Sequence, residues 1–389
     1  MSVVAPTGFG AAGGHVGIKP GEVPDCAVVA CTLAAPASGA GVFTSNLAAA
    51  APVVASRAHL AATAGLVRGV VVTSGNANAA TGPAGLVRAE GLCATVAASL
   101  RAPINQVLIA QTGLIGVPFA FEQCTAGVEA VCAAIGSADG DGDAAADAML
   151  TTDTRRKQFA EAFDGFTVGA MAKGAAMLAP NMATMLAVLT TDAACDPLTL
   201  QRLLRDAVTP TFNRLHVDGA TSTNDTVFAL ASGAVGPVDA DALGAALTDA
   251  CASLARQMAD DAEGATRTAT ITVRGAASEH EAHVGARAVG GSLLVKCSLN
   301  GADPYWGRVV SELGSAGIEF HLDRVSVAYG GIVVCRAGEP VSHDGAGVAA
   351  HLAGRHVEID CDLGIGGAAA SVLCCDLGPG YIDENRTTS

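Results

Sequence analysis

The stretch KGAAMLAPNMATMLAVLTTDA, from Lys173 to Ala193, is the most informative part of this chain. It carries no charge from Gly174 to Thr191, which indicates a buried segment, and TMLAVLTT within it has the pattern of a buried strand. Before that strand lies the bond between Ala183 and Thr184. A cut there would free an α-amine able to act as base for the threonine hydroxyl, and the small Ala183 leaves room for an N→O acyl shift. Residue types alone favour a simpler interpretation, a core threonine bonded to backbone.

Further short apolar runs bounded by Gly, Ser and Asn indicate more buried strands. They are CAVVAC (26–31), GVVVT (69–73), QVLIA (106–110), ATITV (269–273), RVSVAYGGIVVC (324–335) and ASVLCC (370–375). Helical patterns lie between them at 86–100, 122–135, 198–207 and 239–261. Strands and helices are intermixed, so we expect an α+β or α/β fold whose sheets are covered by helices. The 389 residues are enough for two lobes, and the absence of a flexible linker predicts that they pack closely.

Composition limits the class of protein. The net charge of −15 argues against nucleic acid as a partner, because phosphate binding needs clustered Lys and Arg. The 12 cysteines form no CxxC pair, so we interpret most of them as small apolar fillers in a reducing cytosol, not as metal ligands. No basic residue precedes Lys19, and Pro, Gly and Asn interrupt the uncharged span 27–56. We therefore expect a cytoplasmic protein without signal peptide or membrane helix.

Several motifs point to other functions and are set aside. GFGAAG, residues 8–13, fits the dinucleotide pattern GxGxxG, but only seven residues precede it, so close backbone packing is the preferred interpretation. SADGDGD, residues 137–143, lacks the Gly and Glu that an EF-hand requires and is expected to be a solvated loop. The chain has neither GxSxG nor HExxH. The threonine of MATML thus remains the best candidate nucleophile.

Four further motifs carry candidate site residues, each with a structural alternative. QTGLIG (111–116) can aim a backbone N–H and a hydroxyl at an oxyanion, although the residues taken alone favour a plain strand-to-helix turn. MLTTDT (149–154) ends a helix in a polar loop suited to capping. Lys173 is either a counter-ion for a carboxylate or a side chain that snorkels to solvent. DAEGATR (261–267) places an acid, Glu263, at the end of the longest helix, with Gly264 as its stop.

Together these motifs resemble those of the ornithine acetyltransferase family, the bifunctional glutamate N-acetyltransferases of arginine biosynthesis. GFGAAGGHVGIK, GAGVFTSN, SGNANAATG, QTGLIG, MLTTDT, MATML, DGATSTNDT, DAEGATR, DPYWGR and YIDEN occur in family order from Gly8 to Asn385. The resemblance implies an α/β/β/α layered fold of N-terminal-nucleophile type. It also implies self-cleavage into an α chain, 1–183, and a β chain, 184–389, that stay associated as α2β2.

The resemblance assigns roles to particular residues and implies no metal and no cofactor. Thr184 is the nucleophile, with its own α-amine as base, and Thr112 and Gly113 form the oxyanion hole. The acetyl group passes from N2-acetylornithine through acetyl-threonine to glutamate in one shared pocket, and use of acetyl-CoA as a second donor stays open. Substrate binding falls on the residues Thr152, Lys173, Thr184, Glu263, Asn385 and Ser389.

The chain departs from the family pattern at several positions. The tail YIDENRTTS lacks the usual Tyr after Asn385 and stops at Ser389, one residue early, so the role of Ser389 is the weakest transfer. Tyr305, Thr73, Ala80 and, as a mild departure, Arg267 replace residues that relatives commonly carry. The altered tail and Tyr305 leave open a first rival function, an acyltransferase of specialised metabolism acting on another amine. A second rival is an amidase or aminopeptidase of similar architecture, with water as acceptor.

Overall fold

The structure, a computed structural model, describes residues 2–118, 121–136, 141–177 and 185–386. These residues form two compact units. The larger unit contains the described residues up to 177 together with 185–213 and 220–258, and the smaller contains 214–219 and 259–386. The expected division into two lobes is therefore confirmed, and each unit is described by itself.

The larger unit contains two sheets. The first has the strand order β1-β2-β5-β6, with bounds β1 Phe9–Gly14, β2 Cys26–Cys31, β5 Gly69–Asn76 and β6 Val107–Leu114. The second has the order β4-β3-β11-β9-β8-β7, with bounds β4 Leu66–Val67, β3 Ala37–Phe43, β11 Thr226–Pro237, β9 Leu186–Ala194, β8 Phe166–Lys173 and β7 Lys157–Phe163. The central pair, β9 and β11, is parallel, and the pairs β3–β11 and β8–β9 on either side of it are antiparallel.

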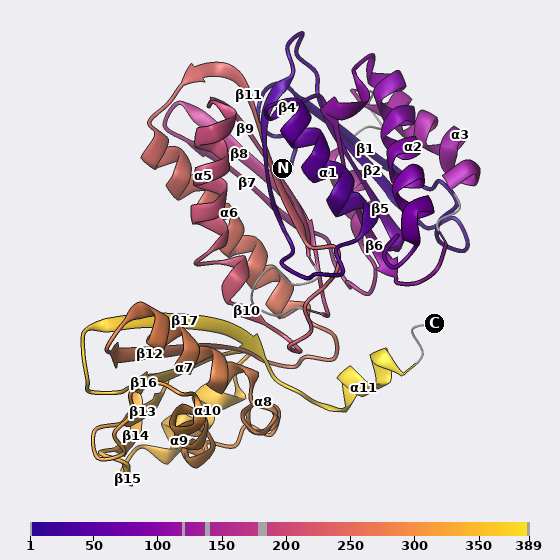
Figure 1. The fold of residues 1–389 in the computed structure, drawn as a ribbon. Helices are drawn as coiled ribbons and strands as arrows, with labels where there is room; N and C mark the ends of the chain where they lie inside the picture. The colour runs from indigo at the N-terminus through magenta and orange to yellow at the C-terminus, as the bar shows by residue number, and fades with distance from the viewer. Residues whose placement is uncertain (1, 119–120, 137–140, 178–184, 387–389) are drawn as a thin grey trace. The chain divides into compact units, whose positions relative to one another are not determined.

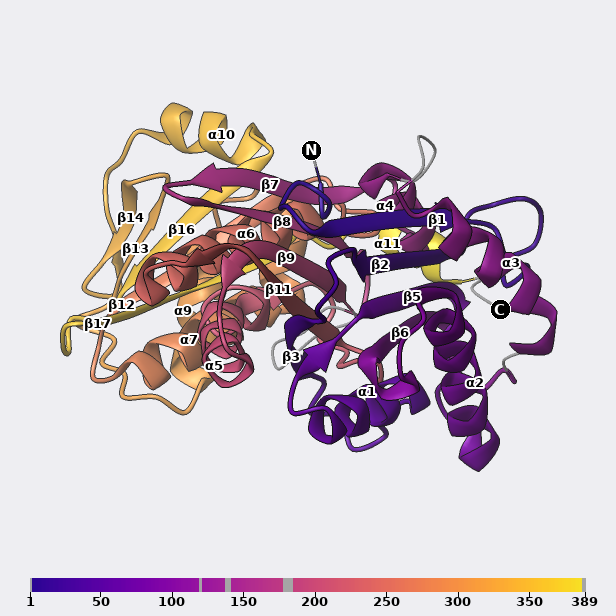
Figure 2. The same cartoon turned by 90° about the horizontal axis from the view of Figure 1, so that it is seen from above.

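Helices cover both outer faces, which gives the expected α/β/β/α layers in this unit (Figures 1 and 2). One hydrophobic core lies between the sheets and includes Val70, Leu108, Val188 and Leu230. A second core packs the other face of the first sheet against three helices, namely α1 (Ala51–Ala62), α2 (Gly82–Leu100) and α3 (Phe121–Ala134). The helices α5 (Pro197–Val208) and α6 (Ala240–Asp260) are joined by glutamine side chains to β3 and β7 of the second sheet.

The glycines of GFGAAG serve backbone packing, as the sequence suggested. The motif forms β1, and α4 (Gly142–Met149) lies directly over it. A Cβ on Gly13 would come within 2.0 Å of the Ala144 carbonyl oxygen, so only glycine permits this approach. Asp141 caps the same helix by accepting the Ala144 N–H at 2.6 Å. The rest of the acidic loop, 137–140, lies outside the described residues.

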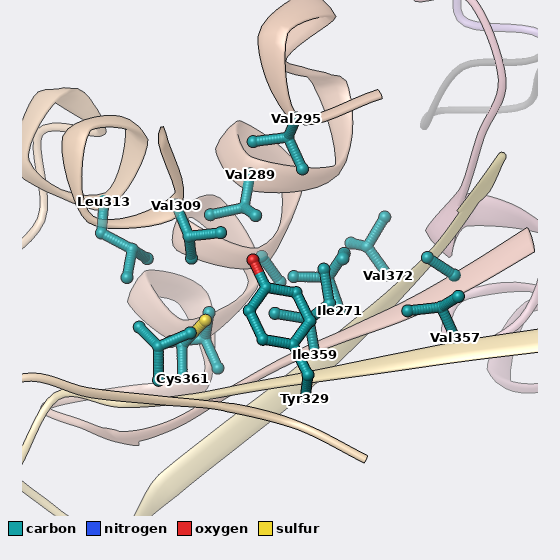
Figure 3. Packing of buried hydrophobic residues seen from close by; sticks show 14 of the residues in the cluster. Ile271, Val289, Val295, Val309, Leu313, Tyr329, Val357, Ile359, Cys361 and Val372 are labelled. Carbon is teal, nitrogen blue, oxygen red and sulfur yellow. The ribbon is translucent and has the colours of Figure 1, made fainter. Parts of the chain in front are cut away.

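The smaller unit is a sheet packed against helices. Its strand order is β10-β17-β12-β16-β13-β14-β15, with bounds β10 Leu215–His216, β17 Ala368–Cys375, β12 Thr268–Ala276, β16 His356–Asp362, β13 Ser326–Tyr329, β14 Ile332–Arg336 and β15 Glu339–Pro340. The helices are α7 (Glu279–Gly291), α8 (Leu293–Asn300), α9 (Trp306–Ser315), α10 (Gly345–Ala353) and α11 (Pro379–Asn385). Figure 3 shows the core, in which Tyr329 lies among Val309, Ile359 and other aliphatic side chains.

Every strand and helix expected from an apolar run has a counterpart, and RVSVAYGGIVVC forms the β13–β14 hairpin. Two short 3₁₀ turns, Ile104–Gln106 and Phe212–Arg214, complete the list of elements. Among the described residues, every cysteine is a free thiol and most are buried, in agreement with their interpretation as apolar fillers. No described helix combines the length and the apolar character needed to span a bilayer.

Candidate functional site

The predicted oxyanion residues lie at the end of a strand. Sequence reasoning placed QTGLIG in a turn, but β6 continues to Leu114, so Thr112 and Gly113 belong to the strand. Gly113 pairs with Gly75 of β5 and has φ +129°. A Cβ at Gly113 would lie 2.2 Å from the Gly75 carbonyl carbon, so both the dihedral angle and the space require glycine. Thr112 is buried and Gly113 is exposed, which leaves the Gly113 backbone open to solvent.

The loop before β11 fixes this strand end. Asn224 is buried, and its Nδ2 donates to the Gln111 carbonyl at 2.8 Å and to the Ala77 carbonyl at 2.6 Å. Asn224 therefore ties the strand that carries Thr112 to the SGNANAATG loop. The departure at Thr73 is accommodated in the same region, because its Oγ1 accepts a hydrogen bond from Gln111 Nε2 at 3.0 Å.

A buried ion cluster links the TTD loop to Lys173. The Asp153 carboxylate lies 2.6 Å from Lys157 Nζ and 3.6 Å from Lys173 Nζ, and it accepts the Gly174 N–H at 2.6 Å. Burial opposes the charge on Asp153, but Lys173 and Lys157 outweigh that effect and hold its pKa well below the ordinary value. Thr152, the predicted substrate contact, is exposed beside this cluster. The structure thus brings Thr152 and Lys173 into one neighbourhood through Asp153, which sequence reasoning did not single out.

Lys19 is a third cation near the TTD loop, and sequence reasoning missed it. Its Nζ donates to the Leu150 carbonyl at 2.6 Å, and burial lowers the pKa of its ammonium group. The buried Asp25 organises the loop that carries Lys19 by accepting N–H bonds from Val16, Ile18 and Lys19 itself. The run GGHVGIK supplies these positions, but nothing in its spacing pointed to charge near residue 150.

A second buried carboxylate, Asp225, lies where the described chain resumes after the predicted cleavage site. Asp225 Oδ1 accepts the Met185 N–H at 3.0 Å. Its Oδ2 is buried and finds no hydrogen-bond partner in the structure as described. Burial raises the pKa of Asp225 well above the ordinary value, against the opposing effects of the Met185 N–H, Lys173 and the neighbouring Ser222 hydroxyl. The pKa values of Asp225 and Asp153 are therefore shifted in opposite directions.

The smaller unit holds the remaining predicted substrate contacts. Asn385 Nδ2 donates to Glu263 Oε2 at 2.6 Å and to the Tyr381 carbonyl at 2.9 Å. Tyr381 donates its phenolic hydrogen to Asp218 at 3.3 Å, and burial, followed by Asp218, raises its pKa to about 12. The expectation for Gly264 was wrong, because α6 ends at Asp260. Gly264 (φ +65°) instead allows the chain of α11 to pass closely, since a Cβ there would lie 2.2 Å from the Tyr381 nitrogen.

The predicted site residues thus fall into three sets. Thr112, Gly113, Thr152 and Lys173 belong to the larger unit, and Glu263 and Asn385 form a hydrogen-bonded pair in the smaller. The cleavage-site pair Ala183 and Thr184, as well as Ser389, lies outside the described residues. In the described part of the chain, no cluster of three His, Cys, Asp or Glu side chains has the arrangement of a metal site.

Two positions that depart from the family pattern, Tyr305 and Arg267, lie in the smaller unit. Tyr305 is exposed, and the guanidinium carbon of Arg308 lies 5.7 Å from its ring centroid. Arg267 donates to the carbonyls of Leu352 and Asn300, both at 2.8 Å. Arg267 therefore joins separate segments of the smaller unit through hydrogen bonds to their backbone.

Comparisons with known proteins cover nearly the whole chain. The model of the "ArgJ family" matches residues 10–387. The chain is 45% identical over 391 residues to the arginine biosynthesis bifunctional protein ArgJ of Thermobifida fusca, with 100% of both chains covered. It is 44% identical to the ArgJ protein of Mycobacterium tuberculosis, covering 100% of this chain and 96% of the relative. A crystal structure of ornithine acetyltransferase complexed with ornithine from that organism is 41% identical over 46% of this chain and 94% of its own, with TM-score 0.43.

Proposed function

This chain belongs to the ArgJ family, and from that premise we propose that it is an acetyltransferase that moves an acetyl group from N2-acetyl-L-ornithine to L-glutamate in arginine biosynthesis. The observation that carries the proposal is the match to curated ArgJ proteins at 45% identity over the full length of both chains. The departures at Thr73 and Arg267 are accounted for by bonds within the fold. The altered tail and Tyr305 motivate the rival acyltransferase, which a panel of acceptor amines without turnover on glutamate would favour.

The proposed activation is a cut between Ala183 and Thr184. The Thr184 hydroxyl adds to the Ala183 carbonyl, the C–N bond breaks with protonation of the Thr184 nitrogen, and water hydrolyses the resulting ester. The products are a chain 1–183 ending in a carboxylate and a chain 184–389 beginning with a free amine. That amine then serves as base for its own hydroxyl.

The proposed transfer runs through an acetyl-threonine. Thr184 Oγ attacks the acetyl carbonyl of N-acetylornithine, ornithine leaves with a proton, and glutamate then takes the acetyl group from the ester. The open Gly113 backbone and the adjacent Thr112 support an oxyanion hole at the end of β6. Lys173 and Thr152 would receive an amino-acid α-carboxylate beside Asp153, and Glu263 with Asn385 the ammonium end of ornithine. Donor and acceptor share one site, so ping-pong kinetics are expected.

Strand order supports the continued association of the two chains after cleavage. In the second sheet of the larger unit, β9 and β11 follow residue 184 in sequence, yet they lie between β3 and β8, which precede it. Six residue pairs join β3 to β11 and six join β8 to β9. We propose an α2β2 assembly of these paired chains, without cofactor, in the cytoplasm, where the free thiols of the described cysteines would persist.

The test is an intact mass spectrum of the purified protein beside the variant Thr184→Ala. We expect two fragments that divide at Ala183/Thr184 in the wild type and one uncut chain in the variant. Thr191→Ala, which removes another buried threonine hydroxyl, is the matched control and should be cut. The cut protein should transfer acetyl from acetylornithine to glutamate faster than it releases acetate. An uncut wild-type chain of about 38.3 kDa would rule out the proposed mechanism.

A further inference from the structure

Glutamate brings to the site a chemical group that has no partner among the residues assigned so far. Glutamate and ornithine share an α-carboxylate and an amine, but glutamate carries a side-chain carboxylate where ornithine carries an ammonium group. Glu263, proposed for that ammonium group, would repel a carboxylate. A further cation is therefore needed for the acceptor. This need rests on the proposed function, because it exists only if glutamate is the acceptor.

Lysine is rare in this chain and is kept away from its surface. The sequence contains four lysines beside 18 arginines, and three of the four are buried while Lys19 is half-buried. Three of them gather near the TTD loop. Lys157 and Lys173 lie 2.6 and 3.6 Å from the Asp153 carboxylate, and Lys19 donates to the Leu150 carbonyl. Because each ammonium group is a compact charge with three donors, this cluster suits an anionic ligand.

Lys19 lies between the predicted oxyanion strand and the TTD loop. A Cβ on Gly75 would come within 2.9 Å of Lys19 Cγ, and Gly75 pairs with Gly113 across β5 and β6. At its other end, Lys19 Nζ donates to the Leu150 carbonyl at 2.6 Å, two residues before Thr152 in the chain. The side chain of Lys19 therefore links the proposed oxyanion hole to the proposed α-carboxylate contact, within the larger unit.

The loop that carries Lys19 is held in place through its main chain. Asp25 is fully buried and accepts the backbone N–H groups of Val16, Ile18 and Lys19 at 2.6 to 2.9 Å. These bonds fix the position of the Lys19 backbone without using the donors of its ammonium group. A cation positioned in this way loses little conformational entropy when a ligand binds, which favours affinity.

The ammonium group of Lys19 has capacity left for a ligand. Its partners are two neutral carbonyls, those of Pro24 at 2.9 Å and Leu150 at 2.6 Å, so one of its three donors is left. Lys173 is buried, and its described ion-pair partner is Asp153 at 3.6 Å. Burial, reinforced by Lys173, lowers the pKa of Lys19, so the two ammonium groups are close enough to interact.

We propose that Lys19 binds the side-chain carboxylate of the glutamate acceptor. Lys173 and Thr152 hold the α-carboxylate, and the remaining donor of Lys19 forms a charged hydrogen bond to the second carboxylate. Lys19 repels the ammonium group of the leaving ornithine, so one side chain favours the exchange of ornithine for glutamate. Lys19 is thus a specificity-determining residue, and it neither gives nor takes a proton.

The test compares two acceptors, glutamate and glutamine, in wild type and Lys19→Met. Methionine keeps an apolar stem beside Gly75 but has neither charge nor donor. We expect the ratio of kcat/KM for glutamate over glutamine to fall about 10- to 100-fold, mostly through KM, as is usual when a hydrogen bond between charged groups is lost. Release of ornithine from acetylornithine in the first turnover should change little.

The matched control is Arg101→Met, which removes an exposed positive charge from the same unit and should keep the wild-type ratio. A second variant, Lys19→Gln, carries no charge but keeps a donor for the Leu150 carbonyl, so it preserves the loop if Lys19→Met melts far below wild type. A lowered ratio in a folded Gln variant supports the role of Lys19, and a wild-type ratio overturns it.

The outcomes separate the role of Lys19 from the proposed function. A wild type that acetylates neither acceptor contradicts the proposed function. A wild type that prefers glutamate, beside a Lys19→Met variant with the same preference, overturns only the role of Lys19. Equal losses with glutamate, with glutamine and in the release of ornithine would mean that Lys19 only shapes its loop, and would overturn the role as well.

Discussion

At the scale of single residues, burial and neighbouring charges determine the pKa values of the buried carboxyl groups. Asp153 and Asp225 are both buried aspartates in the larger unit. Asp153 lies between two ammonium groups, whereas Asp225 has the Met185 N–H and the Ser222 hydroxyl beside it and no ion pair among the described residues. The pKa of Asp153 is therefore well below the ordinary carboxyl value, and the pKa of Asp225 is above it. Such opposed pairs divide acid and base roles within one site.

Replacing Asp153 with Asn should destabilise the fold strongly. The change would leave Lys157 and Lys173 buried without their carboxylate, which typically costs about 3–5 kcal/mol. Because the pKa of Asp153 is lowered in the folded state, its contribution is present above the ordinary carboxyl pKa and is lost as pH falls toward the folded value. Urea unfolding of wild type and variant from pH 3 to 7 measures both effects. A difference that does not shrink in acid would contradict the assignment.

At the scale of secondary structure elements, the close contact of β5 and β6 holds the backbone of the proposed oxyanion hole in place. Gly113→Ala should lower the rate of acetyl transfer about 100- to 1000-fold, the usual effect of losing an oxyanion donor, because the new methyl group would collide with Gly75 and shift the strand end. Gly116→Ala is the matched control, since Gly116 also has positive φ (+79°) but open space around it. Steady-state kinetics of both variants test this; equal rates would remove Gly113 from the site.

A buried histidine on β10, the edge strand of the smaller unit, predicts that the stability of the fold falls in acid. His216 is buried, and burial, reinforced by Lys296 and Arg287, lowers its pKa to about 4. A lowered histidine pKa means that the unfolded chain takes up a proton first, so stability should decline as pH falls from about 6.5 toward 4, by roughly 1–3 kcal/mol. His216→Gln should flatten this slope in denaturant titrations, and substitution of the exposed His343 should leave it unchanged.

At the scale of the whole molecule, the interleaved second sheet predicts how the products behave. After cleavage, 1–183 and 184–389 should elute together in size-exclusion chromatography and separate only in denaturant, because β9 and β11 lie between strands of the other product. Dilution to nanomolar concentration should not release either fragment. Separate elution under native conditions would contradict the strand order as the source of association.

The sequence predicted the helices and strands more fully than it predicted which distant residues contact each other. Apolar runs located the buried strands, because that pattern depends on residues adjacent in the chain. Motif order singled out Thr112, Lys173 and Glu263, and their roles stay predictions. Asp225, Lys19 and Asn224 were missed, since their roles come from partners more than a hundred residues away or from burial that no local pattern records. Gly264 was misjudged for the same reason: its neighbour is α11, not the helix before it.

The position of β9 and β11 between β3 and β8 also bears on whether sheet assembly or the proposed cleavage comes first. The Met185 N–H bond to Asp225 forms only when β9 lies beside β11, so we expect the proposed cut at the residue before Met185 to follow assembly of this sheet. Under the proposed mechanism, a copy that fails to complete the sheet would stay uncut and would lack the α-amine that acts as base.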